Sequence, residues 1–358
     1  MRMNFDLKTI QKNIVIYGAQ MVGVSVYYAL RTLIPDCVII NFLVSDYTGN
    51  PREIDGVQVV TLNEFDLCDD IQVLIATPEN YHKEIAYQLE SKGVHQYMCI
   101  TSDVEMAIMK RYYNAIGRFV SLYDLPKGSS KAEAVAYMSK FYKDRKLDTV
   151  VTLPDWVIPI QAGTDLTDIR VADICDNVGD NISQKNVNYC ELSAMYWIAR
   201  HVKCDYMGLF HYRRVLDIQE EDLYRIKNND VDVVLPYPTV HYPNINKHHE
   251  RYIHPSDWAA MEQALQEVRP EYAKALPELL QTPFFYNYNI LLAKRDVFKR
   301  YCDWMFPVLE RVEELSIPKG SERADRYIGY MGENLTTLFF MYHKDDFNIV
   351  HAGRKMFV

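Results

Sequence analysis

Short apolar runs alternate with helical stretches over residues 13–100 of the chain. The first run, residues 13–17, ends at Gly18, and a turn that closes at Gly23 leads into a helical pattern. A second run spans residues 37–44, and further runs follow, separated by another helical pattern. Strands that alternate with helices form parallel sheets, because each crossover needs a long connection to return the chain. We therefore predict an α/β fold that starts with a Rossmann-like parallel sheet domain.

The glycine turn is only a partial nucleotide-binding motif. The dinucleotide fingerprint GxGxxG has a middle glycine that lets the backbone approach a pyrophosphate, and Gln20 occupies that position here. Asp46 follows the second apolar run, where an acid that binds ribose would lie. Gly18, Gly23 and Asp46 are therefore the candidate ligand residues, but bound NAD(P) is not expected. The alternative is a degenerate domain that only packs or that binds another small ligand.

The length of 358 residues predicts more than one domain, because single hydrophobic cores stop growing near ~250–300 residues. A cluster of turn-forming residues at 126–130 is the clearest break, and residues 131–146 have an amphipathic helical pattern. We therefore expect a Rossmann-like domain over residues 1–124, a helical linker over 125–147 and a second α/β domain over 148–358.

Composition and charge exclude several classes of protein. A net charge of −9 is unsuited to general nucleic-acid binding, which needs a basic face. The seven cysteines are scattered without a CxxC pair, which argues against a disulfide framework and a cysteine zinc site. The N-terminus lacks a secretory signal, and no apolar run reaches the ~20 residues that span a bilayer. The expected location is the cytoplasm, with peripheral association at the inner face of the plasma membrane as a further possibility.

One strand in the second half of the chain ends in a cationic cluster. The apolar run at 205–210 is followed at once by His211, a tyrosine, Arg213 and Arg214. A strand with this ending places fixed cationic donors at a cleft, and arginine binds phosphate through two parallel hydrogen bonds. The alternative is a surface ion pair with the glutamates at 220–221.

The second half of the chain contains a series of distinctive motifs, in the order Asp180–Ser183, Tyr189–Leu192, His211–Arg214, Tyr288–Leu292, Tyr301–Pro307 and Gly329–Leu335. Over about residues 148–345, these motifs are similar to those of a family of bacterial glycosyltransferases that is catalogued as domain of unknown function 4422. The family is found in capsular, exopolysaccharide and O-antigen loci. Asn334 stands where the family pattern has arginine, so the contact made by that arginine is in doubt.

This resemblance implies a GT-A-like glycosyltransferase domain that is a hexosyltransferase. The expected donor is a UDP-sugar carrying galactofuranose or another hexose, and the expected acceptor is a lipid-linked oligosaccharide of a cell-surface polysaccharide. Inversion with a carboxylate general base is the expected mechanism. Membrane contact would come through the lipid of the acceptor, nucleic acid is not an expected partner, and the sequence does not indicate an oligomeric state.

The resemblance and the chemistry together suggest which residues bind the donor. His211, Arg213 and Arg214 would face the diphosphate, where negative charge develops on the leaving group. Small and amide-rich residues of the first strands and loops would contact the nucleotide and the sugar, although an ordinary polar loop is the alternative. These nucleotide-binding candidates are Thr152, Gly163, Thr164, Asp176, Asp180 and Asn181.

Inverting transfer needs a general base to deprotonate the acceptor hydroxyl. Related enzymes place a carboxylate at the start of a helix late in the domain, and Glu333 fits that place. The alternative is a helix-terminal residue that only interacts with the helix dipole. Asp257 is the second candidate base. The acceptor-binding candidates are His254, Trp258, Tyr288 and Asn289.

The sequence requires no cofactor, although Mg²⁺ or Mn²⁺ is a candidate. Related enzymes hold the metal on an Asp-x-Asp motif at a strand end, whereas Asp230 and Asp232 precede a strand. We therefore expect arginines in place of the metal. Two other functions stay open: an NAD(P)-dependent oxidoreductase or epimerase that acts on nucleotide sugars, and a non-catalytic nucleotide-sugar-binding protein. The missing glycine argues against the former, and only turnover distinguishes the latter.

Overall fold

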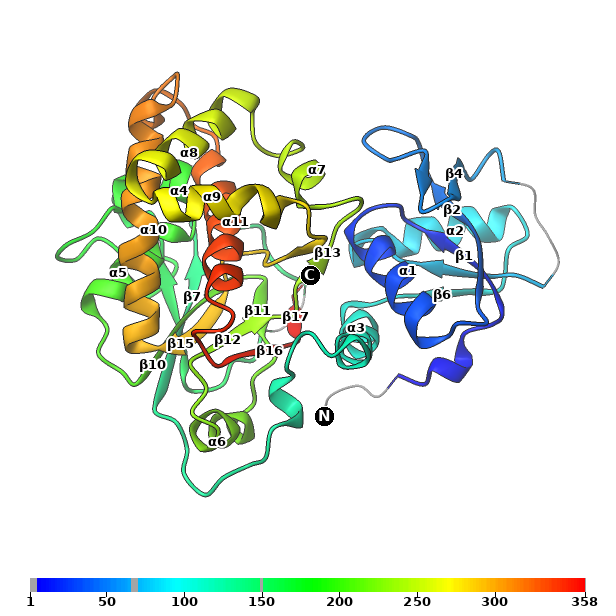
Figure 1. The fold of residues 1–358 in the computed structure, drawn as a ribbon, viewed down its shortest axis with the longest axis horizontal. Helices are drawn as coiled ribbons and strands as arrows, with labels where there is room; N and C mark the ends of the chain where they lie inside the picture. Colours follow the sequence, from blue (N-terminus) through cyan, green and yellow to red (C-terminus); the bar gives the residue numbers. More distant parts are fainter. Residues whose placement is uncertain (1–4, 66–69, 149–150, 358) are drawn as a thin grey trace. The chain divides into compact units, whose positions relative to one another are not determined.

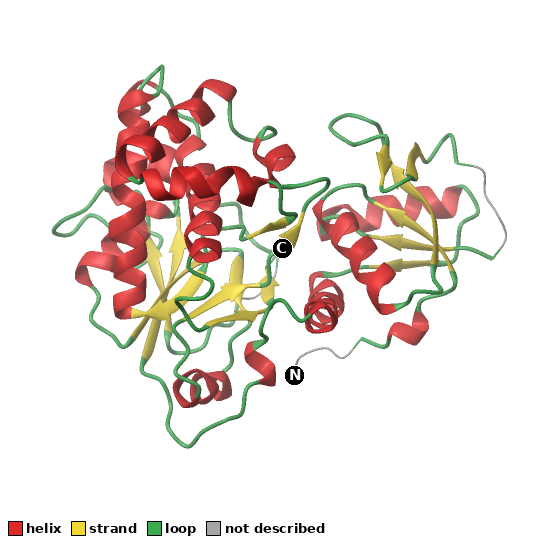
Figure 2. Ribbon diagram, in the orientation of Figure 1, coloured by secondary structure: helices red, strands yellow, loops and turns green. Residues whose placement is uncertain are grey.

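A computed structural model describes residues 5–65, 70–148 and 151–357 of the chain (Figure 1). The chain divides into two compact units. The first contains the residues up to Phe119 together with Thr239–Asn244, and the second contains Val120–Pro238 and Ile245–Phe357. Both units combine helices with a β-sheet (Figure 2), so the predicted α/β class is confirmed.

The first unit has a six-stranded sheet in the order β3-β4-β2-β1-β5-β6, in which every adjacent pair is parallel except β3 and β4. The predicted parallel sheet is therefore confirmed. Its elements are η1 (Leu7–Thr9), β1 (Asn13–Tyr17), α1 (Met21–Leu33), β2 (Val38–Val44), β3 (Glu53–Ile54), β4 (Val57–Thr61), β5 (Gln72–Ile75), η2 (Glu79–Tyr81), α2 (His82–Ser91), β6 (Tyr97–Cys99) and α3 (Ser102–Ile116).

Helices cover both faces of this sheet, because alternate side chains of a strand point to opposite faces. Val15 and Tyr17 of β1 belong to a buried cluster with Ile85 of α2. Tyr27 of α1 packs against Phe42 of β2, with ring centroids 5.3 Å apart. A sheet buried on both faces explains why its strands read as continuous apolar runs.

A short segment from the second half of the chain belongs to the first unit. This segment, Thr239–Asn244, contains β13 (Thr239–Val240). The backbone N–H of Val240 donates to Ser25 Oγ of α1 at 3.4 Å, and the N–H of Asp55 donates to Tyr242 Oη at 3.3 Å. The sequence pattern did not predict this discontinuity.

The second unit has a mixed sheet in the order β16-β12-β15-β10-β7-β8-β9, in which β11 also pairs with β10, and β17 pairs with β11. Its strands are β7 (Ala134–Lys140), β8 (Val157–Gln161), β9 (Ile174–Cys175), β10 (Tyr206–His211), β11 (Arg214–Leu216), β12 (Val233–Pro236), β14 (Phe284–Phe285), β15 (Leu291–Lys294), β16 (Ile349–Ala352) and β17 (Arg354–Met356). Its helices are η3 (Leu122–Asp124), η4 (Thr164–Leu166), η5 (Ser183–Lys185), α4 (Asn186–Tyr189), α5 (Leu192–His201), α6 (Glu220–Asn228), α7 (Ile245–His249), α8 (Pro255–Val268), α9 (Pro270–Leu280), α10 (Arg295–Leu315), η6 (Gly320–Glu322) and α11 (Tyr327–Tyr342).

The helical linker predicted for residues 125–147 is wrong. Residues 134–140 form β7, which lies between β10 and β8 in the centre of the sheet. A short apolar run buried on both faces has no period-two signal, so periodicity alone cannot separate it from a helix. Residues 151–153, near the start of the predicted second domain, have no regular structure, while residues 149–150 lie outside the described part.

Two buried clusters cover the two faces of this sheet. The larger cluster joins the sheet to α5, α8, α9, α10 and α11, and the smaller one joins it to α6 and η3. Within the described ranges, no helix is long and apolar enough to cross a membrane.

Candidate active site at the strand ends of the second unit

Four neighbouring strands of the second unit end at the same edge of the sheet. His211, the last residue of β10, pairs with Ser139 of the parallel strand β7. Lys140 of β7 pairs with Gln161 of β8, which in turn pairs with Cys175 of β9. Ligands of open α/β sheets bind outside the carboxyl ends of their strands. This edge is therefore the place where residues from several loops can act on one ligand.

The His211–Arg214 turn puts two arginines at this edge. His211 pairs with Arg214 across the turn into β11, and Arg213 lies between them. The Nε groups of Arg213 and Arg214 are buried, and neither has a hydrogen-bond partner in the described part of the chain. A buried donor without a partner costs about 1–3 kcal/mol. This cost, together with two like charges side by side, indicates that the turn is built to meet an anion.

Arg326 is a third arginine of this site, and the sequence pattern did not predict it. Its Nε donates to Cys190 Sγ at 3.1 Å, just before α11 begins. Burial and the charges of Arg214, Arg213 and Arg326 hold the pKa of His211 well below its usual range. The histidine is therefore neutral at physiological pH. No sequence signal marks Arg326, because it lies in a polar loop far from the His211–Arg214 motif.

Asp144 brings a carboxyl group close to the arginines. It follows β7, and its Oδ2 accepts a hydrogen bond from the backbone N–H of Phe141 at 2.7 Å. Burial raises its pKa to about 6, although the charges of Arg213 and Arg326 act in the opposite direction. Asp144 is therefore a second group of this site that the sequence pattern did not predict, because it lies in the segment expected to be a helical linker.

Glu333 faces the same cluster of charges. It lies in the second turn of α11, which begins at Tyr327, so the expected place at a helix start is wrong. Its Oε1 accepts a hydrogen bond from the backbone N–H of Tyr288 at 3.0 Å. Burial raises the pKa of Glu333 to about 8, and the charge of Glu191 adds to this effect. A carboxyl group with this pKa can exchange a proton near neutral pH.

Tyr288 and Asn289 form a strained dipeptide that holds two carboxyl groups. Both residues have positive φ angles, 78° and 51°, which non-glycine residues rarely adopt. Asn289 is buried, and its Nδ2 donates to Glu191 Oε1 at 2.9 Å and to the carbonyl of Gly329 at 3.1 Å. The ring of Tyr288 lies 4.1 Å from the Arg214 guanidinium carbon. The structure thus places two of the four predicted acceptor residues, Tyr288 and Asn289, at the strand-end site, with Asn289 already bound to Glu191.

Asp176, a predicted donor-binding residue, has a different place. Its carboxylate is fully buried and accepts hydrogen bonds from the backbone N–H groups of Gly163 and Thr164 and from the hydroxyls of Ser183 and Ser193, at 2.6–3.1 Å. Both oxygens are occupied by groups of the chain itself. Asp176 therefore fixes the loop that follows β8, and Gly163 and Thr164 contribute backbone donors to that loop.

The other predicted nucleotide contacts lie apart from the arginine cluster. Asp180 pairs with Arg200 at 3.0 Å in the last turn of α5. Asn181 Nδ2 donates to the carbonyl of Gly179 at 2.8 Å, which closes a local turn. Thr152 is exposed in a segment without regular structure. In the described ranges, no hydrogen bond or ion pair joins these residues to the three arginines.

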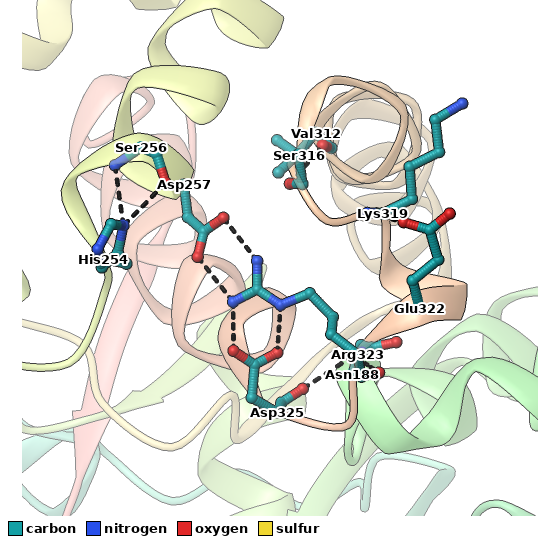
Figure 3. Close-up of polar contacts among 10 residues, drawn as sticks. All are labelled: Asn188, His254, Ser256, Asp257, Val312, Ser316, Lys319, Glu322, Arg323 and Asp325. Atoms are coloured by element: carbon teal, nitrogen blue, oxygen red, sulfur yellow. Dashed lines mark hydrogen bonds and ion pairs between the residues drawn. The ribbon is translucent and has the colours of Figure 1, made fainter.

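Asp257, the second candidate base, is engaged by an arginine (Figure 3). Arg323 donates to both of its oxygens, at 2.7 and 2.8 Å, and also pairs with Asp325. Asp257 is only 1% exposed. A carboxylate whose two oxygens are bound by one guanidinium is poorly placed to accept a further proton.

Two predicted acceptor residues beside Asp257 have structural contacts. His254 caps α8, because its Nδ1 accepts from the backbone N–H of Ser256 at 3.3 Å (Figure 3). The buried ring of Trp258 stacks on His249 with centroids 3.5 Å apart. Neither of these two contacts involves a residue of the strand-end site.

Asp230 and Asp232 lie at the other edge of the sheet, as expected. Both bind Lys294 Nζ, at 2.6 and 2.8 Å, and Lys294 pairs with Tyr206 at the start of β10. A lysine therefore occupies the position between the two carboxylates. No group of three or more metal-binding side chains occurs among the described residues.

The glycine turn of the first unit is shaped by packing. Gly18 has a φ of +119°, and a Cβ added at Gly23 would lie 1.8 Å from the Gly18 carbonyl oxygen. Gln20 Nε2 donates to the Gly49 carbonyl at 2.6 Å and to Asn50 Oδ1 at 2.7 Å. The turn is thus tied to the loop that follows β2.

Asp46 lies in that same loop, where the sequence predicted an acid. It is exposed, and its Oδ1 accepts from the backbone N–H of Thr48 at 2.7 Å. This hydrogen bond lowers the pKa of the Asp46 carboxyl. The acid is therefore ionised and closes its own turn.

The fold of this chain has a counterpart among solved structures. The WbbM bifunctional glycosyltransferase aligns with a TM-score of 0.53 and 24% identity, over 62% of this chain and 45% of the WbbM chain. The match spans less than half of WbbM, and it shows a shared fold. The mannosyltransferase Ktr4p from S. cerevisiae aligns at 10% identity over 60% of this chain and 70% of its own, with a TM-score of 0.25.

The family follows from the sequence of the second unit. The pattern described as Domain of unknown function (DUF4422) matches residues 145–345, more than half of the chain. The protein belongs to this family, which confirms the resemblance noted from its motifs. Among curated proteins, none has a sequence that matches this chain significantly.

Proposed function

We propose that the second unit is a glycosyltransferase that moves a hexose from a UDP-sugar to a hydroxyl group of a lipid-linked glycan. One observation carries this proposal: the buried Nε groups of Arg213 and Arg214, which have no partner among the described residues, lie with the half-buried Glu333 and the buried Glu191 at the carboxyl edge of a parallel strand group. Arginines suit a diphosphate, and a carboxyl group suits a hydroxyl that must lose its proton. The shared fold with WbbM and the family membership support the same reading.

In this proposal, Arg213, Arg214 and Arg326 bind the diphosphate of the donor. The bond between the anomeric carbon and the diphosphate oxygen breaks, and UDP leaves with the electron pair. The guanidinium groups stabilise the charge that develops on this oxygen, which is the largest electrostatic demand of the reaction. They would supply the charge that Mg²⁺ or Mn²⁺ supplies in related enzymes, so we propose transfer without a required metal.

Glu333 acts as the general base. The acceptor hydroxyl gives its proton to the Glu333 carboxylate, and its oxygen forms the new bond to the anomeric carbon. Attack from the side opposite the leaving diphosphate inverts the configuration. The Tyr288 N–H holds Glu333 in place, and Arg214 and Arg326 favour its ionised form, whereas the charge of Glu191 disfavours it. Asp257, already bound by Arg323, is not required in this scheme.

The donor-binding step is tested by thermal shift with a panel of nucleotide sugars, in the presence of EDTA and in the presence of Mn²⁺. Selective stabilisation by UDP-sugars that survives EDTA supports the arginine site, because a ligand that binds only the folded state raises its stability. Stabilisation that requires Mn²⁺ would contradict metal-free binding. Thermal stabilisation by NAD(P) alone would indicate that the first unit binds the functional ligand and that the reaction is a redox reaction.

The chemical step is tested by the release of UDP in the presence of a glycan acceptor. Release that depends on both the acceptor and Glu333 supports transfer. Donor binding without any turnover would instead indicate a nucleotide-sugar-binding protein.

A further inference from the structure

A cavity of about 620 Å³ lies beside the N-terminal turns of α10, remote from the candidate active site. Helix α10 starts directly after Lys294, which pairs with the first residue of β10, Tyr206. The arginine turn follows the last residue of the same strand, His211. Five residue steps of about 3.3 Å separate the two ends, so the cavity lies about 17 Å or more along the sheet from the arginine turn.

The cavity is cationic although the chain as a whole is acidic. Two aspartates, Asp296 and Asp303, also line it, yet no cation of the cavity forms an ion pair in the described part of the chain. Arg295, Lys299 and Arg300 are exposed, so their charge is accessible to a ligand. The cations that line the cavity are Arg269, Arg295, Lys299 and Arg300.

The contacts of these cations leave most of their donors available. Arg269 donates from Nη1 to the carbonyl of Val268 at 3.3 Å and from Nη2 to that of Asp303 at 3.1 Å, while its buried Nε has no partner among the described residues. Lys299 Nζ donates to the Ala199 carbonyl at 3.2 Å. The guanidinium carbon of Arg300 lies 5.1 Å from the ring centroid of Phe347. The N-terminal end of α10 adds partial positive charge to the same place.

Aromatic side chains form the floor of the cavity. Tyr272 and Trp304 line it with ring centroids 4.7 Å apart. The Tyr272 hydroxyl hydrogen-bonds to His343 Nε2 at 2.6 Å, and His343 Nδ1 is in turn paired with Asp346, so the tyrosine ring is fixed. The buried indole Nε1 of Trp304 has no hydrogen-bond partner within the described ranges. Tyr272 and Trp304 are each 6% exposed and fixed in the core, so they offer a ligand a small, rigid apolar surface beside the cations.

We propose that this cavity binds an anionic saccharide, namely a carboxylate-bearing segment of a glycan. Guanidinium and ammonium groups would bind the carboxylate, and the aromatic floor would pack against the apolar face of the sugar ring. The volume lies within the range of small-molecule sites, ~300–1,000 Å³. The choice of a saccharide rests on the proposed glycosyltransferase function, whereas the anionic character rests on the cavity alone. A ligand here would hold a part of the glycan that is remote from the reacting hydroxyl.

The test compares the full-length protein with the double variant Arg295→Ala/Arg300→Ala in calorimetric titrations. Tetragalacturonate is the anionic probe, and maltotetraose is the neutral probe of equal length. The wild type is expected to bind tetragalacturonate and not maltotetraose. The double variant is expected to bind tetragalacturonate about tenfold more weakly or worse, because two charge-assisted contacts are lost. The matched control Lys83→Ala/Lys274→Ala removes the same charge from exposed positions outside the cavity and should bind like the wild type.

Three results would overturn this proposal: equal binding of both tetrasaccharides, unchanged affinity in the double variant, or an equal loss in the control. Binding to phosphatidylglycerol vesicles, lost in the double variant while tetragalacturonate never binds, would assign the cavity to a lipid surface instead. The UDP-sugar thermal shift is measured on every variant. A normal shift in the double variant shows that it folds and that the strand-end site is intact. A shift absent from all proteins would contradict the proposed function without affecting the tetragalacturonate result.

Discussion

The two units each contain a parallel strand that ends in a tight turn. The two turns differ in whether their polar side chains find hydrogen-bond partners within the described chain. In the first unit, Gln20 binds the loop after β2, and Asp46 closes its own turn. In the second unit, Arg213 and Arg214 each retain a buried Nε without a partner in the described chain. The fold places loops at the ends of its strands in both units. A ligand site also needs polar groups whose hydrogen bonds are not already made within the chain.

The largest expected effect concerns the carboxyl group that faces the arginine turn. Glu333→Gln keeps the shape of the side chain but removes the base, so we expect sugar transfer to fall about 10²–10⁴-fold. UDP-sugar binding should persist, because the arginines are unchanged. Initial rates of UDP release and a thermal shift measure the two effects separately. The control Glu262→Gln changes an exposed glutamate on α8 and should keep full activity; a Glu333→Gln enzyme of normal rate would show that the base lies elsewhere.

The second prediction compares the two turns directly. Arg213→Ala should weaken UDP-sugar binding about tenfold to hundredfold, because a hydrogen-bonded charge is lost from the diphosphate site. Gln20→Ala, at the corresponding turn of the first unit, should leave this affinity unchanged. Calorimetric titration of both variants gives the comparison. Equal losses in the two variants, or a loss in Gln20→Ala alone, would show that the first unit takes part in donor binding.

The third prediction concerns the pH dependence of transfer. Glu333 must be ionised to accept a proton, so the rate should rise with pH and level off above its pKa of about 8. The neighbouring charge of Glu191 contributes to this high value. Glu191→Gln removes that charge and should move the rising limb to lower pH by about one unit. A lower rate with an unmoved limb would mean that Glu191 only supports the structure.

The smallest expected effect concerns the stability of the first unit. Gly23→Ala would place a Cβ against the Gly18 carbonyl, so the variant should lose about 1–3 kcal/mol. Amide hydrogen exchange in β1 and β2 and the thermal midpoint report this loss. At Gly93, an added Cβ meets nothing within 4 Å and only the φ of +83° opposes it, so Gly93→Ala should cost less. UDP-sugar affinity should stay unchanged in both variants, unless the turn binds the donor.

The features that the sequence predicted correctly are those that depend on a short local pattern of residues. Parallel strands and the cationic turn at His211 could be read directly, because each is encoded within a few consecutive residues. The place of Arg326 at the site and the electrostatic effect of Glu191 on Glu333 could not be predicted, because they depend on how α5 and α11 pack. Asp176 is an error of the opposite kind, because it was predicted to bind the donor. Its carboxylate does accept hydrogen bonds, but it accepts them from the chain's own groups. The central strand β7 was misread as a helix because burial on both faces removes the period that distinguishes a strand.

The return of Thr239–Asn244 to the first unit limits how this protein can be recombined. An exchange of gene segments with a breakpoint at residue 119 would transfer most of the first unit without this piece. Ser25 and Asp55 would then lose the partners that Val240 and Tyr242 provide, and the buried Ser25 hydroxyl would lose a hydrogen bond. A hybrid protein therefore needs a matching hexapeptide in its second half. The two halves are expected to be inherited together, even where the catalytic half alone would suffice for the chemistry.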